Sequence, residues 1–185
     1  MNRLIVGMSG ASGAVIGIRL LESMRHFSDW ETHLILSRAA RQTIRMETEY
    51  SEEEVCSLAS CIYSTDDVGA CVASGTFKTS GMAIVPCSMK TVAGIAIGYS
   101  ENLLLRAADV ALKEKRRLVV VARETPLNAI HLRNMLTLAE MGAMILPPML
   151  SFYNRPDSVQ DQVDHIVGKI LNSFDLEWSG FRRWK

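Results

Sequence analysis

The sequence has no excess of charge of either sign. Its 20 Lys and Arg side chains balance 20 Asp and Glu side chains, so the formal net charge at pH 7 is +0. Nucleic-acid binding depends on a basic surface that displaces counterions. The equal numbers of positive and negative side chains give no electrostatic reason to expect a nucleic-acid partner. A neutral surface also favours self-association. We therefore expect a homo-oligomer that binds no nucleic acid.

Long apolar runs and metal-binding motifs are also missing. No stretch approaches the roughly 20 apolar residues of a membrane-spanning helix, and the apolar run at 4–8 is too short for a signal peptide. The cysteines form no C-x-x-C pair, and the histidines form no H-E-x-x-H or H-x-H motif. These absences favour a cytoplasmic protein with reduced thiols, no membrane association and no metal site.

Signals of disorder are weak as well. Only 5 residues are Pro and 12 are Gly, whereas 48% of the 185 residues are hydrophobic. A chain of this length can bury roughly 70% of its unfolded surface without a disulfide or a metal. We expect a single domain over residues 1–185. The C-terminal helix and tail at 158–185, which contain Trp178 and Trp184, are expected to pack at subunit contacts.

Short apolar runs alternate with helical patterns along the chain. The predicted strands cover 4–8, 32–36, 82–85, 118–122 and 144–146, with Pro86 closing the third. The predicted helices cover 14–25, 38–48, a short segment opened by a capping box at 51–54, 88–96, 103–114, 127–141 and 158–174. Residues 61–80 are expected to form a loop around one small strand or helix. Strands separated by helices imply a doubly wound parallel sheet in a Rossmann-like or flavodoxin-like three-layer α/β domain.

Small hydroxyl or charged residues follow the predicted strands. The segments 9–12, 37–38, 87–91 and 123–124 each come after a strand. Ligands of open parallel sheets bind beyond the carboxyl ends of the strands, and hydroxyl-rich turns that open helices bind phosphate. The first turn, G-M-S-G-A-S-G, lacks the G-x-G-x-x-G spacing, and no G-x-x-x-x-G-K-[ST] loop occurs. A mononucleotide is therefore favoured over a dinucleotide or ATP.

Several side chains near these turns have alternative interpretations. Arg123 and Glu124 end a strand, so both are expected at the rim where a ligand would lie. Arg106 and Lys113 lie seven residues apart on one helical face, which by itself is typical of a solvated surface. Cys87 at a strand end has the position of a nucleophile, but no pattern supplies a base, and a packed thiol is favoured.

Seven ordered motifs cover nearly the whole chain. They are M-S-G-A-S-G-A at 8–14, S-R-A-A at 37–40, P-C-S-M-K-T at 86–91, N-L-L-L-R-A-A-D-V-A-L-K-E at 102–114, V-A-R-E-T-P-L at 121–127, I-H-L-R-N-M-L at 130–136 and F-Y-N-R-P at 152–156. With these motifs the chain resembles the flavin prenyltransferases, small FMN-binding proteins long named aromatic acid decarboxylases. The resemblance implies that dimethylallyl monophosphate reacts with reduced FMN at N5 and C6, without a metal. The prenylated FMN would pass to a partner decarboxylase of aromatic or α,β-unsaturated acids.

The resemblance also implies roles for individual residues. FMN would be held by Gly10, Ala11, Ser12, Ser37, Ser88, Met89, Lys90, Thr91 and Arg123. The substrate phosphate would be bound by Lys113, Arg123, Tyr153 and Lys169. The catalytic set would be Ser12, Glu47, Arg106, Lys113 and Glu124. Ser12 and Glu47 would lie beside flavin N5, Glu124 would relay a proton, and Trp184 is a candidate aromatic wall that keeps water from an allyl cation. Lys169 stands where some relatives carry Arg, which keeps the charge without the bidentate fork. Family members assemble as dodecamers with active sites at subunit junctions.

Three other activities are compatible with parts of these motifs. A flavin-dependent cysteine decarboxylase would carry Asn where Lys90 stands. A non-catalytic FMN-binding subunit of a phenolic acid decarboxylase would have no use for a second set of phosphate-binding residues. Direct decarboxylation of a phenolic acid by the chain alone is the third. The segment 61–80 also lacks the Trp that some relatives place against the substrate, which leaves the wall of the prenyl pocket undefined.

Overall fold

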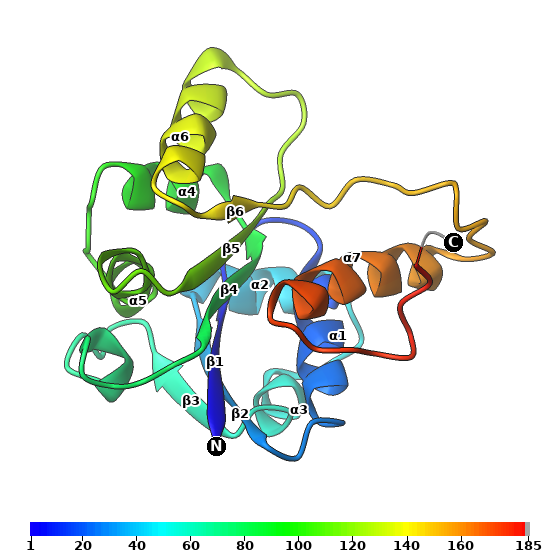
Figure 1. The fold of residues 1–185 in the computed structure, drawn as a ribbon, viewed down its shortest axis with the longest axis horizontal. Coiled ribbons are helices and arrows are strands. Elements are labelled where there is room, and N and C mark those ends of the chain that lie inside the picture. The colour runs from blue at the N-terminus through cyan, green and yellow to red at the C-terminus, as the bar shows by residue number, and fades with distance from the viewer. Residues whose placement is uncertain (184–185) are drawn as a thin grey trace.

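The computed structural model describes residues 1–183, and its centre is a six-stranded parallel sheet (Figure 1). The strands are β1 (Asn2–Met8), β2 (Trp30–Leu36), β3 (Cys61–Ser64), β4 (Gly81–Cys87), β5 (Arg117–Ala122) and β6 (Met144–Ile145). Their order is β3-β2-β1-β4-β5-β6, with every neighbouring pair parallel. The winding direction reverses between β1 and β4, and open α/β sheets bind ligands at such a switch point.

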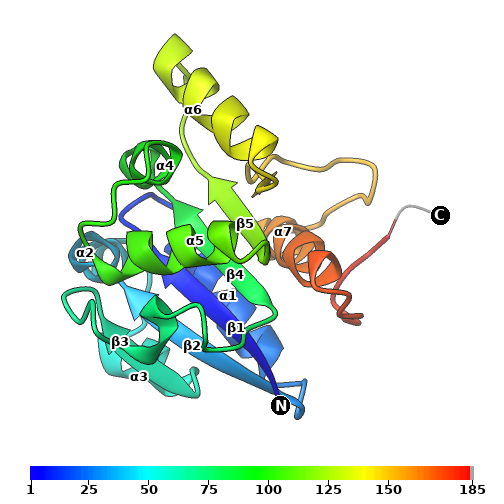
Figure 2. The same ribbon diagram turned by 60° about the vertical axis from the view of Figure 1, so that its left-hand side comes forward.

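Helices cover both faces of the sheet. They are α1 (Ala14–Met24), α2 (Arg38–Glu47), α3 (Glu52–Ser57), α4 (Met89–Ala96), α5 (Leu103–Lys113), α6 (Ala129–Glu140) and α7 (Val159–Ser173), with a short 3-10 turn η1 (Cys71–Ala73). One core joins the sheet to α1, α2, α3 and α7, and a second core joins it to η1, α4, α5 and α6. Figure 2 shows α5 in front of the sheet and α1 behind it, with α6 extending beyond both layers. The predicted doubly wound, three-layer α/β fold is confirmed.

The predicted strands and helices are present, with small differences at their ends. β1 and β2 begin earlier than predicted, at Asn2 and Trp30. α6 begins later, because the Asn128 side chain caps it by accepting a hydrogen bond from the His131 N–H at 2.9 Å. The capping box at the start of α3 is confirmed. Residues 61–80 hold both a strand, β3, and the turn η1.

Pro86 does not close its strand, contrary to the sequence-based expectation. β4 continues through Pro86 to Cys87, and its pairing with β5 shifts register between Ile84 and Cys87. Proline has no N–H for a ladder, and the bulge accommodates it where the ladder is already interrupted. The Pro86 carbonyl instead accepts a hydrogen bond from the Ser9 N–H at 3.1 Å, across the switch point.

The C-terminal tail folds back on its own chain. The Arg19 guanidinium lies 5.3 Å from the Trp178 ring, and Phe181 packs against α7. Helix α7 itself packs on α1 and contributes to the first core. The expected contact of the 158–185 segment with a neighbouring copy stays a prediction. Within residues 1–183, no helix has both the length and the apolar character that crossing a membrane requires.

Candidate active site

The turns after β1 and β4 are joined by one serine at the switch point. Ser9 Oγ donates a hydrogen bond to the Pro86 carbonyl at 3.0 Å and accepts one from the Ser88 N–H at 2.7 Å. A cavity of about 440 Å³ lies beside these turns, which is within the roughly 300–1,000 Å³ range of small-molecule sites. Five residues assigned to a cofactor from the sequence line it, namely Gly10, Ser37, Ser88, Lys90 and Thr91.

Three helices begin at this cavity. The Ser37 side chain caps α2, accepting from the Ala40 N–H at 3.0 Å. Ser88 caps α4, and Asn102 caps α5. The N-terminus of a helix carries a partial positive charge and N–H groups without helical partners, so it binds anions. The cavity therefore suits a phosphorylated ligand.

Gly10 allows the turn after β1 to approach helix α2 closely. A Cβ atom at this position would overlap the Cβ of Ala39 in the first turn of α2. Because both residues line the cavity, any larger side chain at position 10 would push apart the two segments that form its wall.

Ser12, Glu47 and Arg123 come together although they lie far apart in the sequence. Glu47 Oε2 accepts hydrogen bonds from the backbone N–H groups of Gly13, at 2.8 Å, and Ala14, at 3.2 Å. Glu47 is largely exposed, and its partial desolvation raises its pKa, but a hydrogen bond from Ser12, these two N–H groups and the charge of Arg123 together lower that pKa below its ordinary value. The carboxylate at the end of α2 is thus ionised and caps the start of α1.

Arg123 and Glu124 lie at the carboxyl end of β5, as the sequence predicts. The Arg123 N–H donates to the Cys87 carbonyl at 3.0 Å, which ties this end of β5 to the turn before α4. Glu124 is exposed, and its Oε1 accepts from the Thr125 N–H at 3.0 Å. Both side chains line a hollow of about 250 Å³ with Met149.

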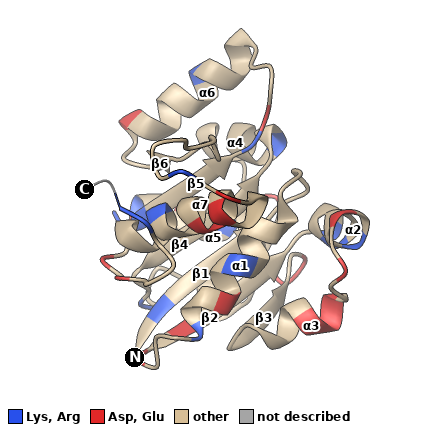
Figure 3. Cartoon of the chain, turned by 90° about the vertical axis from the view of Figure 1, so that its right-hand side faces the viewer, with Lys and Arg blue, Asp and Glu red and all other residues tan. Residues whose placement is uncertain are grey.

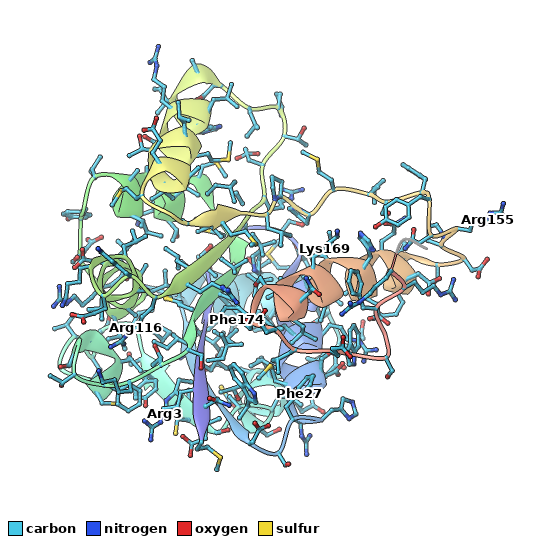
Figure 4. The ribbon with its side chains drawn as sticks, viewed as in Figure 1. Arg3, Phe27, Arg116, Arg155, Lys169 and Phe174 are labelled. Carbon is cyan, nitrogen blue, oxygen red and sulfur yellow. The ribbon has the colours of Figure 1, made fainter. Side chains whose placement is uncertain are left out.

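Tyr153 and Lys169 line a second hollow, of about 430 Å³, beside the first. Pro147 and Met149 line both hollows, so the two are adjacent. Lys169 projects from α7 on the side of the segment that connects β6 to α7, whereas Arg155 lies at the far turn of that segment (Figure 4). The chain thus forms one continuous rim of Arg123, Glu124, Tyr153 and Lys169.

Two of the predicted residues, Arg106 and Lys113, are not brought to this rim. Lys113 ends α5 at the amino edge of the sheet, opposite the switch point, where its Nζ donates to Glu114. Arg106 points toward η1, donating from Nε to the Ala73 carbonyl at 3.2 Å and from Nη1 to Asp109 at 2.7 Å. The expectation that both join the same cation cluster is not met within one chain, because α5 runs away from the carboxyl edge.

The remaining predicted residues are buried or lie outside the described part. Ala11 and Met89 are buried, so little of either residue is exposed to a ligand. Cys87 is fully buried, and burial raises the pKa of its thiol, which confirms the packed thiol. Trp184 lies outside residues 1–183. Those residues include no group of three or more His, Cys, Asp or Glu side chains placed to hold a metal.

A larger hollow, of about 640 Å³, lies at the amino edge of the sheet. None of the residues assigned to the site from the sequence lines it. The arginines of this hollow already have partners in the chain. Arg116, which Figure 4 labels, donates to the Phe77 carbonyl at 2.7 Å, and Arg117 forms a salt bridge with Asp175. The crevice at the switch point is therefore the better candidate.

Comparison with known proteins identifies the family of this chain. The sequence matches the flavoprotein family over residues 1–175. A probable UbiX-like flavin prenyltransferase from Streptomyces sp. (strain D7) is 59% identical, over 98% of this chain and 91% of that protein. The chain belongs to the flavin prenyltransferase family.

Two solved structures of similar proteins show an oligomeric state and a pair of bound ligands. A dodecameric FMN-dependent UbiX-like decarboxylase from Escherichia coli O157:H7 has a TM-score of 0.98 and 50% identity, covering 99% of each chain. AnUbiX (PadA1), in complex with FMN and dimethylallyl pyrophosphate, has a TM-score of 0.97 and 48% identity, covering 100% of this chain and 97% of that one.

Sequence reasoning missed part of the lining of the crevice in this member of the flavin prenyltransferase family. Asn102 lines it and caps α5, a position that the N-cap signature before Leu103 indicates. Thr65 and Asp66 also line it. They follow the edge strand β3, and the Leu103 N–H donates to the Thr65 carbonyl at 2.8 Å. Because the 61–80 segment shows little periodicity, no sequence signal indicated this contact.

Proposed function

We propose that this chain joins the dimethylallyl group of dimethylallyl monophosphate to reduced FMN at N5 and C6. One observation carries the proposal: the Arg123 N–H donates to the Cys87 carbonyl at 3.0 Å, which joins the crevice turn at Ser88 to the rim that presents Arg123, Tyr153 and Lys169. Two phosphorylated molecules must meet in this reaction, and the chain offers an anion-binding region for each. The solved relative that contains both FMN and dimethylallyl pyrophosphate supports a site that takes FMN together with a phosphorylated dimethylallyl compound.

The crevice fits FMN. The close approach of Gly10 to α2 and the caps Ser37 and Ser88 form a cradle of backbone and hydroxyl donors for a phosphate. We assign FMN binding to Gly10, Ala11, Ser12, Ser37, Ser88, Met89, Lys90, Thr91 and Arg123. Reduced FMN would supply the nucleophilic N5 and C6 atoms.

The rim residues would stabilise the leaving phosphate. The allylic C–O bond breaks and its electron pair leaves with the phosphate, so negative charge on the phosphate oxygens grows in the transition state. Cations and hydroxyl donors that face these oxygens lower the barrier, because they bind the transition state more tightly than the substrate. We assign this role to Arg123, Tyr153 and Lys169, and we assign proton transfer to the phosphate to Glu124.

Ser12 and Glu47 would act on the flavin side of the crevice. The Ser12 hydroxyl donates to the Glu47 carboxylate, so the hydroxyl oxygen is held in one orientation. The lowered pKa of Glu47 keeps its carboxylate ionised, so the carboxylate holds the Ser12 hydroxyl by accepting its hydrogen bond.

Arg106 and Lys113 would reach the site from a neighbouring copy of the chain. The dodecameric relative supports such an assembly. Helix α6 also presents an exposed apolar surface, with Ile130 62%, Leu132 53% and Leu136 59% exposed. In Figure 3 most of this helix is tan, and its charged residues are Arg133 and Glu140. An exposed apolar patch of this kind is typical of a protein–protein contact, and we assign α6 and the 158–185 segment to subunit contacts.

The product would pass to a partner decarboxylase of aromatic or α,β-unsaturated acids in the cytoplasm. Exposure of Glu124 and Tyr153 at the rim supports release of a product from an open site. All four cysteines are free, which supports a reducing compartment.

Anaerobic incubation with reduced FMN and dimethylallyl monophosphate tests the proposal. We expect mass spectrometry to show a flavin heavier by one C5 unit. Recovery of unmodified FMN alone would refute the transferase activity and leave a flavin carrier. Loss of CO₂ from 4-hydroxybenzoate or a cinnamic acid in the presence of the purified chain alone would instead indicate direct decarboxylation.

A further inference from the structure

Tyr63, on the edge strand β3, brings a histidine and a cysteine together outside the crevice. Its ring packs against the second core. Its hydroxyl oxygen is 3.2 Å from Cys71 Sγ at the start of η1 and 2.9 Å from His33 Nδ1 on β2. His33 is 3% exposed, whereas Cys71 is exposed. A solvent-accessible thiol thus lies beside a buried polar pair.

A second thiol, that of Cys61, faces the same hydroxyl from β3 itself. Cys61 and Tyr63 are two residues apart in the strand, so their side chains lie on the same face. Cys61 pairs in register with His33, and the Tyr63 hydroxyl reaches the His33 ring, so the tyrosine extends back along the strand over the position of Cys61. Burial raises the pKa of Tyr63, and hydrogen bonds with Cys71 and Cys61 raise it further. Both thiols therefore contact one hydroxyl group.

The other two cysteines of the chain are placed differently. Cys56 packs against the first core, on the opposite face of the sheet, and burial raises the pKa of its thiol. Cys87 is fully buried in the second core. Cys61, by contrast, is half-buried next to the exposed Cys71. The two thiols that can meet are thus Cys61 and Cys71.

We infer that Cys61 and Cys71 are a redox-sensitive pair, which forms a reversible disulfide and ties together both ends of the segment 61–71. This segment contributes Thr65 and Asp66 to the crevice. Its residues 66–69 are exposed, so the turn between the cysteines has room to adjust while the sulfurs approach the S–S distance of about 2.05 Å. In a reducing compartment the pair stays as two thiols, and it joins when glutathione disulfide accumulates.

The reaction is a thiol–disulfide exchange with glutathione disulfide. The exposed Cys71, as a thiolate, attacks one sulfur of glutathione disulfide, whose S–S bond breaks, and one glutathione thiolate leaves. The Cys61 thiolate then attacks the Cys71 sulfur of this mixed disulfide, and the second glutathione thiolate leaves. Two protein thiols are oxidised, one glutathione disulfide is reduced, and the two thiol protons end on two glutathione molecules.

The disulfide acts on the crevice through the segment that it closes. Between β3 and η1 this segment is tied to α5 by the Leu103 N–H, which donates to the Thr65 carbonyl at 2.8 Å. A disulfide removes conformations in which Thr65 and Asp66 leave the crevice, so FMN has less of the segment to order when it binds. The oxidised protein should therefore bind FMN more tightly. This effect rests on the proposed function, whereas the disulfide rests on the positions of the two thiols.

Differential alkylation of the full chain tests the disulfide. Reduced protein is incubated with glutathione disulfide, and free thiols are blocked with N-ethylmaleimide in denaturant. Thiols released by reduction are then labelled with iodoacetamide and located by fragment mass spectrometry. We expect the second label on Cys61 and Cys71, the first label on Cys56 and Cys87, and an intact oxidised chain lighter by two hydrogen atoms.

Two variants and two outcomes decide the pairing. Cys61→Ser should leave Cys71 joined to glutathione. Cys56→Ser, at a half-buried cysteine of the other core, is the matched control and should behave as the wild type. The first label on Cys61 or Cys71 of the oxidised wild type, or glutathione retained on its Cys71, would overturn the inference.

FMN titration of the oxidised and reduced wild type tests the effect on the crevice. We expect oxidation to lower the FMN Kd about 2–5-fold, the scale of ordering one side chain in advance, and dithiothreitol to restore the reduced value. Cys71→Ser should show the same Kd with and without the oxidant. An unchanged or raised Kd in the oxidised wild type would overturn the role of the disulfide at the crevice. A reduced wild type that binds FMN but forms no prenylated flavin would refute the proposed function, and the label positions would still decide the disulfide.

Discussion

Replacing Glu47 by Gln removes the charge of a carboxylate that caps helix α1 from the end of helix α2. In the wild type, Glu47 Oε2 accepts from the Gly13 and Ala14 N–H groups at 2.8 and 3.2 Å. Gln keeps an acceptor oxygen of similar reach but has no charge. The comparison of Gln and Ala at position 47 therefore separates the electrostatic part of this cap from its hydrogen bonds.

The magnitudes follow from the position of Glu47 at a helix N-terminus. A negative charge there contributes roughly 0.3–1 kcal/mol, and loss of a capping acceptor costs about 1 kcal/mol more. For a domain of this size, 1 kcal/mol shifts Tm by about 2–4 °C. We expect Glu47→Gln to lower Tm by about 1–4 °C and Glu47→Ala by about 3–8 °C at pH 7.

The effect of Glu47→Gln should depend on pH in one direction. The folded-state pKa of Glu47 lies below its unfolded value, so its charge stabilises the folded protein above the unfolded pKa of about 4.3. This contribution is lost as the pH falls through the folded pKa. The Tm difference between the wild type and Glu47→Gln should thus be complete at pH 7 and shrink in acid below pH 4.3.

Differential scanning calorimetry at one fixed protein concentration measures these shifts, since Tm of an oligomer depends on concentration. Glu49→Gln, at an exposed carboxylate just after α2, is the matched control and should leave Tm unchanged. A Glu47→Gln variant with the wild-type Tm, or a difference that persists undiminished in acid, would refute the capping role.

Three further results are expected. Gly10→Ala should weaken FMN binding at least about 5-fold in a fluorescence titration, because its Cβ overlaps Ala39 and such overpacking costs about 1–3 kcal/mol. An unchanged affinity would show that the two segments separate freely. Ser37→Ala should weaken FMN binding and lower the free energy of unfolding by about 1 kcal/mol, because a helix cap is lost. Glu124→Gln should stop turnover while FMN stays bound. The reverse pattern would overturn both roles. Mixed oligomers reassembled from Lys113→Ala chains and Glu124→Gln chains should regain activity that neither variant has alone. Some sites between two subunits would then combine an intact Lys113 from one chain with an intact Glu124 from the other. Absence of recovery would place both residues in the site of one subunit.

Local sequence signals predicted much of the fold. Apolar runs such as residues 4–8 indicate buried strands whatever their neighbours are, and the serines at 37 and 88 indicate helix starts because a cap acts within one turn. Both serines indeed cap helices at the carboxyl edge of the sheet. The expectation that Pro86 ends its strand is wrong, because the bulge that keeps this proline inside β4 depends on the partner strand β5.

The sequence by itself determined the α/β class, the position of the polar turns at the carboxyl ends of the strands, and the family resemblance. These features depend on residues close together in the chain. The tertiary structure decided which distant side chains meet. It brought Glu47 to the start of α1, directed Lys113 to the opposite edge of the sheet, and buried His165 against Tyr153. A helical pattern shows which residues lie on one face, but only the packing of that helix determines what the face contacts.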